Sequence, residues 1–214
     1  MPILLKIDPG KPDENILAEA VGILKRGGVV AYPTETFYGL GADALSGAAV
    51  GKIFQIKGRN FQNPIAVIVD NERGAIPLAE EIPETGRILM QKFWPGPLTL
   101  LFRAAASVPV SLTGGTGKIG VRVSSHPLAR LLARGVAGPL TATSANLSGG
   151  PECTSAGEVF CALGKRVDAV IDGGTTPGGL GSTILDVTAF PPLILREGAV
   201  PGALILSALG LPAG

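Results

Sequence analysis

The chain has one histidine, His126, and two cysteines, Cys153 and Cys161, among its 214 residues. A single imidazole excludes metal sites built on several histidines, and two thiols are too few for a zinc cage, so no protein metal site is predicted. A disulfide is not expected in a reducing compartment, and we expect both cysteines to pack in the fold. His126 precedes Pro127 at an expected helix start, where a positional role is favoured over catalysis.

Net charge, aromatic side chains and long apolar runs are also scarce. The net charge is +1 and aromatic residues make up 5% of the chain, so neither a general basic surface nor base-stacking platforms are indicated. No apolar run reaches about 18 residues and no leader is recognised, so we expect a cytoplasmic protein without a membrane segment. Apolar residues make up 46%, with 31 glycines and 18 prolines, which is typical of a packed core with many tight loops.

Apolar runs alternate with amphipathic segments, which predicts one α/β domain over residues 1–214 on a mixed β-sheet flanked by helices. After a short leading strand, the expected strands are 29–32, 64–69, 98–103, 119–123, 140–143, 169–171, 183–187 and 193–195. The expected helices are about 12–26, 46–57, 84–93, 127–133, 155–163 and a short surface helix from Ala203 onward.

The stretch from Gly27 to Ala44 organises this pattern. It begins as an apolar strand and leaves the sheet at Pro33, which cannot continue a central ladder. Thr, Tyr and Gly residues follow, and the glycines allow the backbone to approach a ligand closely. An ordinary strand and loop is the alternative interpretation of this stretch alone.

Two glycine-rich segments match part of a nucleotide-binding motif, but the residues around them do not fit that motif. Residues 115–120 have the glycine spacing of a dinucleotide fingerprint but lead into a strand, whereas pyrophosphate binding there depends on a helix N-terminus. Gly117-Lys118 lacks the following Ser or Thr of a P-loop, although Lys118 remains free to contact a phosphate. No Gly-x-Ser-x-Gly elbow is present, which weakens a serine hydrolase interpretation.

A set of cations and hydroxyl or amide side chains lies at expected strand and helix ends. Its members are Lys57, Arg59, Arg122 and Arg196 with Thr36, Ser144, Asn146 and Ser182. Arginine forks suit carboxylates and phosphates, and no activated nucleophile accompanies them, so the set favours an anionic ligand that is positioned and neutralised. Solvated surface charges are the alternative for each cation. We expect Lys57 and Arg59 to lie at a helix end, outside the core.

At these residues the sequence resembles the YrdC-like family, the threonylcarbamoyl-AMP synthases of tRNA modification. The matching segments, in family order, are residues 32–40, 57–59 with 63–64, 94–99, 121–123, 143–149, 182–184 and 196–198. The Lys-x-Arg and Ser-x-Asn signature of the family stands at Lys57, Arg59, Ser144 and Asn146. The resemblance implies a twisted sheet with a basic concave groove, and an enzyme that makes threonylcarbamoyl-AMP and pyrophosphate from L-threonine, bicarbonate and ATP.

The resemblance also implies roles for single residues. Lys57 and Arg59 would be catalytic, and Mg²⁺ would accompany ATP. Threonine would be held by Thr36, Arg122, Ser144 and Ser182. The nucleotide would be held by Lys57, Arg59, Asn63, Lys118, Asn146, Thr154 and Arg196. A downstream tRNA threonylcarbamoyl-transfer enzyme would use the product, and direct binding of tRNA or double-stranded RNA is a further implied interaction.

Two features depart from the family pattern. Ile68 stands where some members have a histidine that helps to bind threonine. The chain should also be the short form of the family, in which a loop such as 173–181 closes the active site. Two other functions remain open. One is a non-catalytic RNA-binding paralogue of the same fold. The other is a carbamoyl-adenylate-forming relative, although the acylphosphatase-like and zinc-finger segments that accompany that domain in hydrogenase maturation are missing.

Overall fold

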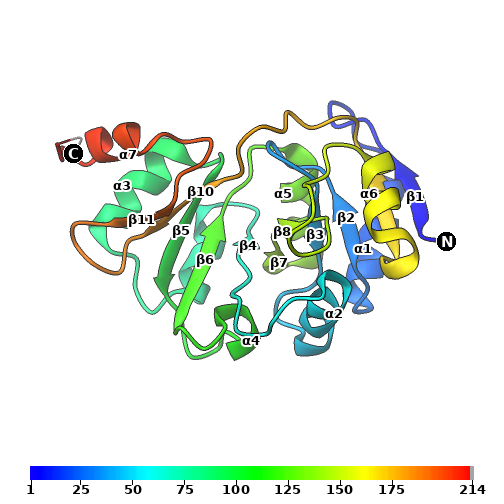
Figure 1. Ribbon diagram of the computed structural model, residues 1–214, viewed down its shortest axis with the longest axis horizontal. Coiled ribbons are helices and arrows are strands. Elements are labelled where there is room, and N and C mark those ends of the chain that lie inside the picture. The colour runs from blue at the N-terminus through cyan, green and yellow to red at the C-terminus, as the bar shows by residue number, and fades with distance from the viewer. Residues whose placement is uncertain (213–214) are drawn as a thin grey trace.

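The computed structural model describes residues 1–212, and its strands form two mixed sheets (Figure 1). The first sheet has the order β1-β9-β2-β3-β8 and the second β11-β10-β5-β6-β4-β7. The strands of the first are β1 (Ile3–Lys6), β2 (Val30–Tyr32), β3 (Gly39–Gly41), β8 (Thr143–Ser144) and β9 (Ala169–Asp172). Those of the second are β4 (Val67–Ile68), β5 (Leu98–Arg103), β6 (Lys118–Arg122), β7 (Leu140–Thr141), β10 (Thr183–Asp186) and β11 (Leu193–Arg196).

Helices cover the outer sides of this pair of sheets. They are α1 (Glu14–Lys25), α2 (Gly47–Lys57), α3 (Glu84–Phe93), α4 (Val110–Thr113), α5 (Pro127–Val136), α6 (Ala156–Leu163) and α7 (Gly202–Ala208), with 3₁₀ turns η1 (Glu72–Leu78) and η2 (Gly164–Arg166). Helix α1 packs on α5. Helix α1 contacts β1, β2 and β9 of the first sheet, whereas α5 contacts β4 and β7 of the second, and leucines of both helices share one buried cluster with Tyr32. Helices α3 and α7 lie together at the far end of the second sheet (Figure 1).

Side-chain caps explain where several helices begin. The Asp13 carboxylate accepts the N–H groups of Asn15 and Ile16, so α1 starts after Asp13 and not at Pro12 as the sequence predicted. The Ser46 hydroxyl caps α2, whose start agrees with the prediction, and Gly58 ends α2 in the left-handed conformation at φ 62°. Such local signals place both ends of α2, the helix that carries Lys57.

The chain passes from one sheet to the other within residues 140–144. Leu140 and Thr141 pair with β4 of the second sheet, and Thr143 and Ser144 pair with β3 of the first. Between them, the N–H of Ala142 donates to Ala66 O at 2.7 Å. The predicted α/β class is confirmed, but the strands divide into two sheets at this crossing where the sequence pattern predicted one.

Other differences from the sequence predictions are local. Strand β3 was not predicted, because its Gly-Leu-Gly segment carries no strand periodicity. The predicted strand 64–69 shrinks to Val67–Ile68 in β4. Cys153 is buried as expected, whereas Cys161 is exposed. In the part of the chain that the structure describes, no helix combines the length and apolar character needed to cross a bilayer.

Candidate functional site

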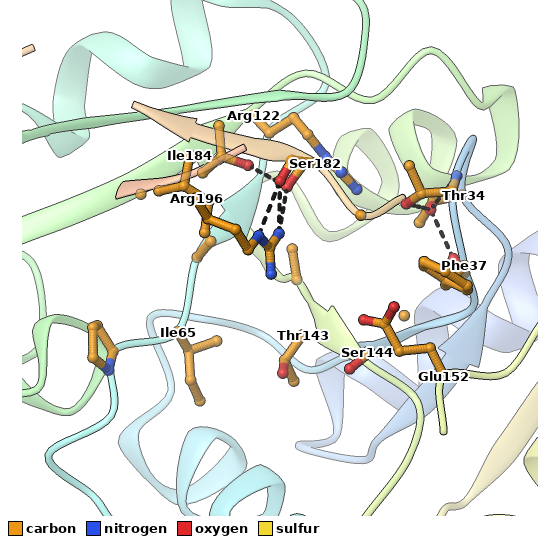
Figure 2. A pocket seen from close by; sticks show the side chains of 18 of the residues that line it. Thr34, Phe37, Ile65, Arg122, Thr143, Ser144, Glu152, Ser182, Ile184 and Arg196 are labelled. Atoms are coloured by element: carbon orange, nitrogen blue, oxygen red, sulfur yellow. Dashed lines mark hydrogen bonds between the residues drawn. The ribbon is translucent and has the colours of Figure 1, made fainter. Parts of the chain in front are cut away.

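A cavity of about 360 Å³ lies between the two sheets (Figure 2). Its walls come from β2, β3 and β8 of the first sheet and from β5, β6, β10 and β11 of the second, with the segments that follow β2 and α2. Among its lining residues, three are arginines, Arg59, Arg122 and Arg196, and one is a carboxylate, Glu152. Hydroxyl groups and apolar side chains from both sheets complete a cationic interior of mixed polarity.

Six of the eleven predicted site residues line this cavity. They are Thr36, Arg59, Arg122, Ser144, Ser182 and Arg196. The structure thus brings together side chains that are up to 160 positions apart in sequence, from Thr36 to Arg196.

The other five lie beside or behind the wall. Asn63 is exposed and immediately precedes Pro64, which lines the cavity. Lys118 forms an ion pair with Asp186 at 2.6 Å, which joins β6 to β10 across the strand β5 that lies between them. Thr154 binds the Glu158 carboxylate through its N–H at 2.6 Å and its hydroxyl at 3.1 Å.

Lys57 and Asn146 form a polar cluster directly behind Ser144. The Lys57 ammonium donates to Ser144 O at 2.5 Å, to Asn146 O at 2.9 Å and to Asn146 Oδ1 at 3.0 Å. The Ser144 hydroxyl donates to Asn146 Oδ1 at 2.6 Å, and Asn146 Nδ2 donates to Gly150 O at 2.5 Å. The two-residue spacing of Ser144 and Asn146 therefore lets one amide oxygen accept hydrogen bonds from both the serine hydroxyl and the lysine ammonium.

The burial of Lys57 corrects one sequence expectation. The residue is the last of α2, as predicted, but it is only 5% exposed and lies within the fold. Burial, and next the neighbouring charge of Arg59, lower the Lys57 pKa from 10.5 to about 8. A helix end does not imply exposure when, as here, the chain folds a loop over it.

Arg59 lines the cavity from the segment that follows α2. Its Nη1 donates to Thr143 Oγ1 at 3.2 Å and its Nη2 to Pro64 O at 3.1 Å, while the guanidinium lies 5.8 Å from the centre of the Phe54 ring. Burial lowers the pKa of Arg59 from its ordinary value. This fork fixes the cation at the end of α2 and holds β8 beside the segment that precedes β4.

Arg196 and Ser182 form a second polar centre on the second sheet. Arg196 donates to Ser182 O through Nε at 3.2 Å and Nη2 at 2.7 Å, and Nη2 also contacts Ser182 Oγ at 3.2 Å (Figure 2). The Ser182 and Thr99 hydroxyls are 3.0 Å apart. The strand pair β10–β11 accounts for this contact, because it places Arg196 beside the start of β10.

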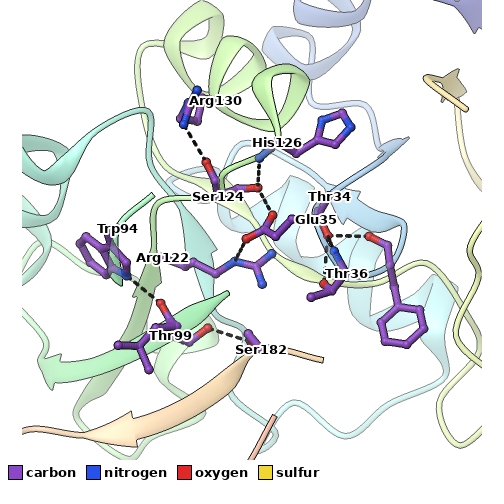
Figure 3. A network of polar contacts seen from close by, with 12 residues as sticks. Thr34, Glu35, Thr36, Trp94, Thr99, Arg122, Ser124, His126, Arg130 and Ser182 are labelled. Carbon is purple, nitrogen blue, oxygen red and sulfur yellow. Dashed lines mark hydrogen bonds and ion pairs between the residues drawn. The ribbon is translucent and has the colours of Figure 1, made fainter. Parts of the chain in front are cut away.

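Arg122 is the most deeply buried cation of the cavity wall. Its side chain is 8% exposed, and its Nε lies 3.9 Å from Glu35 Oε1 (Figure 3). Sequence reasoning missed Glu35 and Glu152, although Glu35 stands between two threonines of the organising stretch. Ile68 is fully buried beside Arg122 in the β4–β6 ladder and does not line the cavity.

The geometry defines an α/β fold with an arginine-lined cavity between two sheets, and comparison with known proteins identifies its kind. A family described as "Telomere recombination", comprising Sua5, YciO and YrdC, matches residues 22–198. The chain belongs to this Sua5/YciO/YrdC family, as the sequence resemblance predicted.

Similar proteins carry the names of synthases. The chain is 43% identical to the threonylcarbamoyl-AMP synthase of Pyrococcus abyssi over 85% of this chain and 54% of that protein. It is 38% identical to the Bacillus subtilis threonylcarbamoyl-AMP synthase over 91% of this chain and 56% of that one. It therefore spans about half the length of these relatives. A crystal structure of P. abyssi Sua5 complexed with L-threonine matches with a TM-score of 0.92 at 39% identity, over 98% of this chain and 61% of that one.

Proposed function

We propose that this chain is an L-threonylcarbamoyladenylate synthase, a nucleotidyltransferase that forms threonylcarbamoyl-AMP and pyrophosphate from L-threonine, bicarbonate and ATP. The observation that carries the proposal is the convergence of Arg59, Arg122 and Arg196 with serine and threonine hydroxyls on one cavity. The names of similar proteins, and the L-threonine in the matching P. abyssi Sua5 structure, support this choice of ligands.

The amino acid fits the part of the cavity around Arg122. A buried guanidinium is suited to a carboxylate, because its N–H groups can donate two parallel hydrogen bonds. The hydroxyls of Thr36, Ser144 and Ser182 line the same cavity and can bind an ammonium, a carboxylate or a hydroxyl without ionising. We therefore assign these four residues to L-threonine.

The nucleotide is assigned to the part of the cavity near Arg59 and Arg196. Both cations line the wall and retain N–H groups that can meet phosphate oxygens. Asn63, Lys118, Asn146 and Thr154 lie beside or behind that wall, so in our proposal they reach the nucleotide only if it extends beyond the cavity or the loops close. Residues 173–181 are the proposed closing loop, since Gly181 lines the cavity.

The proposed reaction needs positioning and charge neutralisation. Bicarbonate carboxylates the threonine amine to a carbamate with loss of water, and a carbamate oxygen then attacks the α-phosphorus of ATP while the bond to pyrophosphate breaks. Arg59 and Arg196 would offset the charge that develops on the leaving pyrophosphate, with Arg59 as the catalytic residue. Lys57 would act through Ser144 and Asn146, which makes it a positioning residue in this mechanism.

Mg²⁺ would arrive with ATP as part of the substrate. Within residues 1–212 no group of three or more His, Cys, Asp or Glu side chains is placed to hold a metal, and Glu152 is the one carboxylate on the cavity wall. Mg²⁺ commonly uses substrate phosphates, water and one or two carboxylates, so this donor set fits an ion carried by the nucleotide. It would supply neutralisation of phosphate charge.

A pyrophosphate-release assay tests the proposed function. With ATP, Mg²⁺ and bicarbonate, we expect release to require L-threonine, to be weaker with L-serine, and to yield threonylcarbamoyl-AMP detectable by mass spectrometry. Arg59→Ala should lose turnover, while Arg87→Ala, an exposed arginine on α3, should keep it. Release with carbamoyl phosphate and no amino acid would indicate a carbamoyl-adenylate-forming enzyme. No release combined with a tRNA gel shift would indicate an RNA-binding paralogue.

The proposed product would be the substrate of a second enzyme. A threonylcarbamoyl adenylate is an activated acyl donor, so in our proposal it passes to an enzyme that transfers the threonylcarbamoyl group to an adenosine of tRNA. Adding such a partner and tRNA to the assay should convert the adenylate into N6-threonylcarbamoyladenosine. Accumulation of the adenylate without modification of the tRNA would contradict its proposed use as the donor for this transfer.

A further inference from the structure

Three buried polar atoms without a hydrogen-bond partner in the described part of the chain belong to one cluster behind the cavity. They are Glu35 Oε1, Arg122 Nε and His126 Nδ1 (Figure 3). Buried polar groups are nearly always hydrogen-bonded, so the two that face each other, Glu35 Oε1 and Arg122 Nε, call for a physical explanation. Of these residues, only Arg122 lines the cavity.

The turn after β2 directs Glu35 away from the cavity. The Thr34 hydroxyl donates to Phe37 O at 2.7 Å and accepts the N–H of Thr36 at 3.1 Å, and the two threonine hydroxyls are 3.1 Å apart. Both threonines line the cavity, whereas Glu35 between them does not. The Glu35 carboxylate thus lies on the opposite side of the wall, toward β6.

Glu35 is held there by Ser124. Its Oε2 accepts a hydrogen bond from the Ser124 hydroxyl, which in turn accepts the N–H of His126 at 3.2 Å. Arg130 Nη1 donates to Ser124 O at 3.3 Å, so the start of α5 anchors the serine. One carboxylate oxygen is therefore fixed, and the other faces Arg122.

The contact between Glu35 and Arg122 balances charge without using hydrogen-bonding capacity. At 3.9 Å, Arg122 Nε and Glu35 Oε1 form an ion pair but are too far apart for a hydrogen bond. No side-chain hydrogen bond of Arg122 is found among residues 1–212, and a guanidinium has five N–H donors. A buried cation that is neutralised but not hydrogen-bonded is ready to receive an anion.

We propose that Glu35 is a positioning residue that fixes the Arg122 guanidinium from its Nε side, so that the Nη1 and Nη2 groups face the carboxylate of the bound amino acid. The identity of that ligand rests on the proposed function, whereas the coupling of Glu35 to Arg122 does not. Glu35 acts through Arg122 and does not touch the substrate.

The first test observes Arg122 without any ligand. In ¹⁵N-labelled protein, the Nε–H signal of Arg122, assigned by its loss in Arg122→Gln, should exchange slowly with water. Glu35→Gln should shift that signal and speed its exchange by about tenfold or more, because the neighbouring charge is lost, and Glu35→Asp should restore part of the protection. Glu84→Gln, which removes the exposed carboxylate 4.0 Å from Arg87, is the matched control. An unchanged Arg122 signal in Glu35→Gln would overturn the inference whether or not threonine is a substrate.

The second test uses the reaction. We expect Glu35→Gln to raise the KM for L-threonine about tenfold, because a displaced guanidinium loses its two-point contact, and to change the KM for ATP less than about twofold. In an Arg122→Gln background the same substitution should have no further effect on the threonine KM. Equal rises in both KM values, or a full effect of Glu35→Gln without Arg122, would show a merely structural role. If wild type fails to use threonine, the proposed function fails while the first test still decides the role of Glu35.

Discussion

Thr141 links the two sheets through one buried hydroxyl. Its Oγ1 donates to Leu40 O at 2.9 Å and accepts the N–H of Ala42 at 2.9 Å, and the residue is fully buried. Thr141→Val keeps the shape of the side chain and removes both hydrogen bonds. A buried donor or acceptor left without a partner costs about 1–3 kcal/mol, so two such groups predict a loss of about 3 kcal/mol in the free energy of unfolding.

Urea denaturation at neutral pH measures this loss. We expect a lower midpoint with an unchanged m-value, and a melting temperature about 6 to 12 °C below that of wild type, given about 2–4 °C per kcal/mol at this chain length. Thr175→Val is the control, because Thr175 is exposed and its hydroxyl makes no hydrogen bond in the described structure, so the substitution should cost no more than about 0.5 kcal/mol. A loss below about 1 kcal/mol in Thr141→Val would refute the claim that this hydroxyl joins the sheets.

Three further predictions concern the site and its surroundings. The pKa of Lys57 is 10.5 in the unfolded chain and about 8 in the folded one, so between pH 8 and pH 10.5 the unfolded state binds more protons. The free energy of unfolding should therefore rise with pH across that window, by up to about 3 kcal/mol. Urea denaturation as a function of pH should show this rise in wild type and in Lys52→Met, whose ammonium is exposed, but not in Lys57→Met. Arg59→Lys cannot bridge Thr143 and Pro64 as the fork does, so the kcat/KM for ATP should fall by at least about tenfold in the pyrophosphate assay, and near-wild-type activity would remove the fork from the mechanism. A maleimide should label Cys161 quickly in the folded protein and Cys153 only after denaturation, because Cys153 is buried and burial raises its pKa; simultaneous labelling, read by mass spectrometry, would contradict the packing around Cys153.

The parts of the fold that the sequence predicted well are those with local physical causes. Ser46 as a cap and Gly58 as a left-handed terminator bound α2, and Pro127 begins α5. The glycine pattern at residues 115–120 was correctly set aside, because it leads into β6 and no helix N-terminus follows. Each of these signals acts within about four residues.

The missed features depend on contacts between distant segments. The division into two sheets arises where residues 140–144 pair with β4 on one side and β3 on the other, and no local pattern marks that change. The burial of Lys57 depends on the loop at Ser144 and Asn146, about 90 residues away. The side-chain direction of Glu35 depends on Ser124, although its sequence neighbours Thr34 and Thr36 were both in view.

The candidate cavity residues were accessible to sequence reasoning for a different reason. Ionic and hydroxyl residues at strand ends are few, and the ordered motifs select among them. Six could therefore be named that the structure gathers around one cavity: Thr36, Arg59, Arg122, Ser144, Ser182 and Arg196. Motifs do not state which side of the wall a residue occupies. The motif named Lys57 and Asn146, but it did not indicate that both lie behind the cavity wall, and their roles remain predictions.

The crossing at residues 140–144 has a consequence for engineering. A break in the chain at Ala142 would detach β7 from one sheet and β8 from the other in a single cut, since each strand is only two residues long. The two halves of the binding chamber therefore cannot be expressed as independent fragments that meet at that point. Permuted or split versions of this protein should be opened at exposed loops far from Ala142, such as residues 189–191 between β10 and β11, at the opposite end of the second sheet from β7.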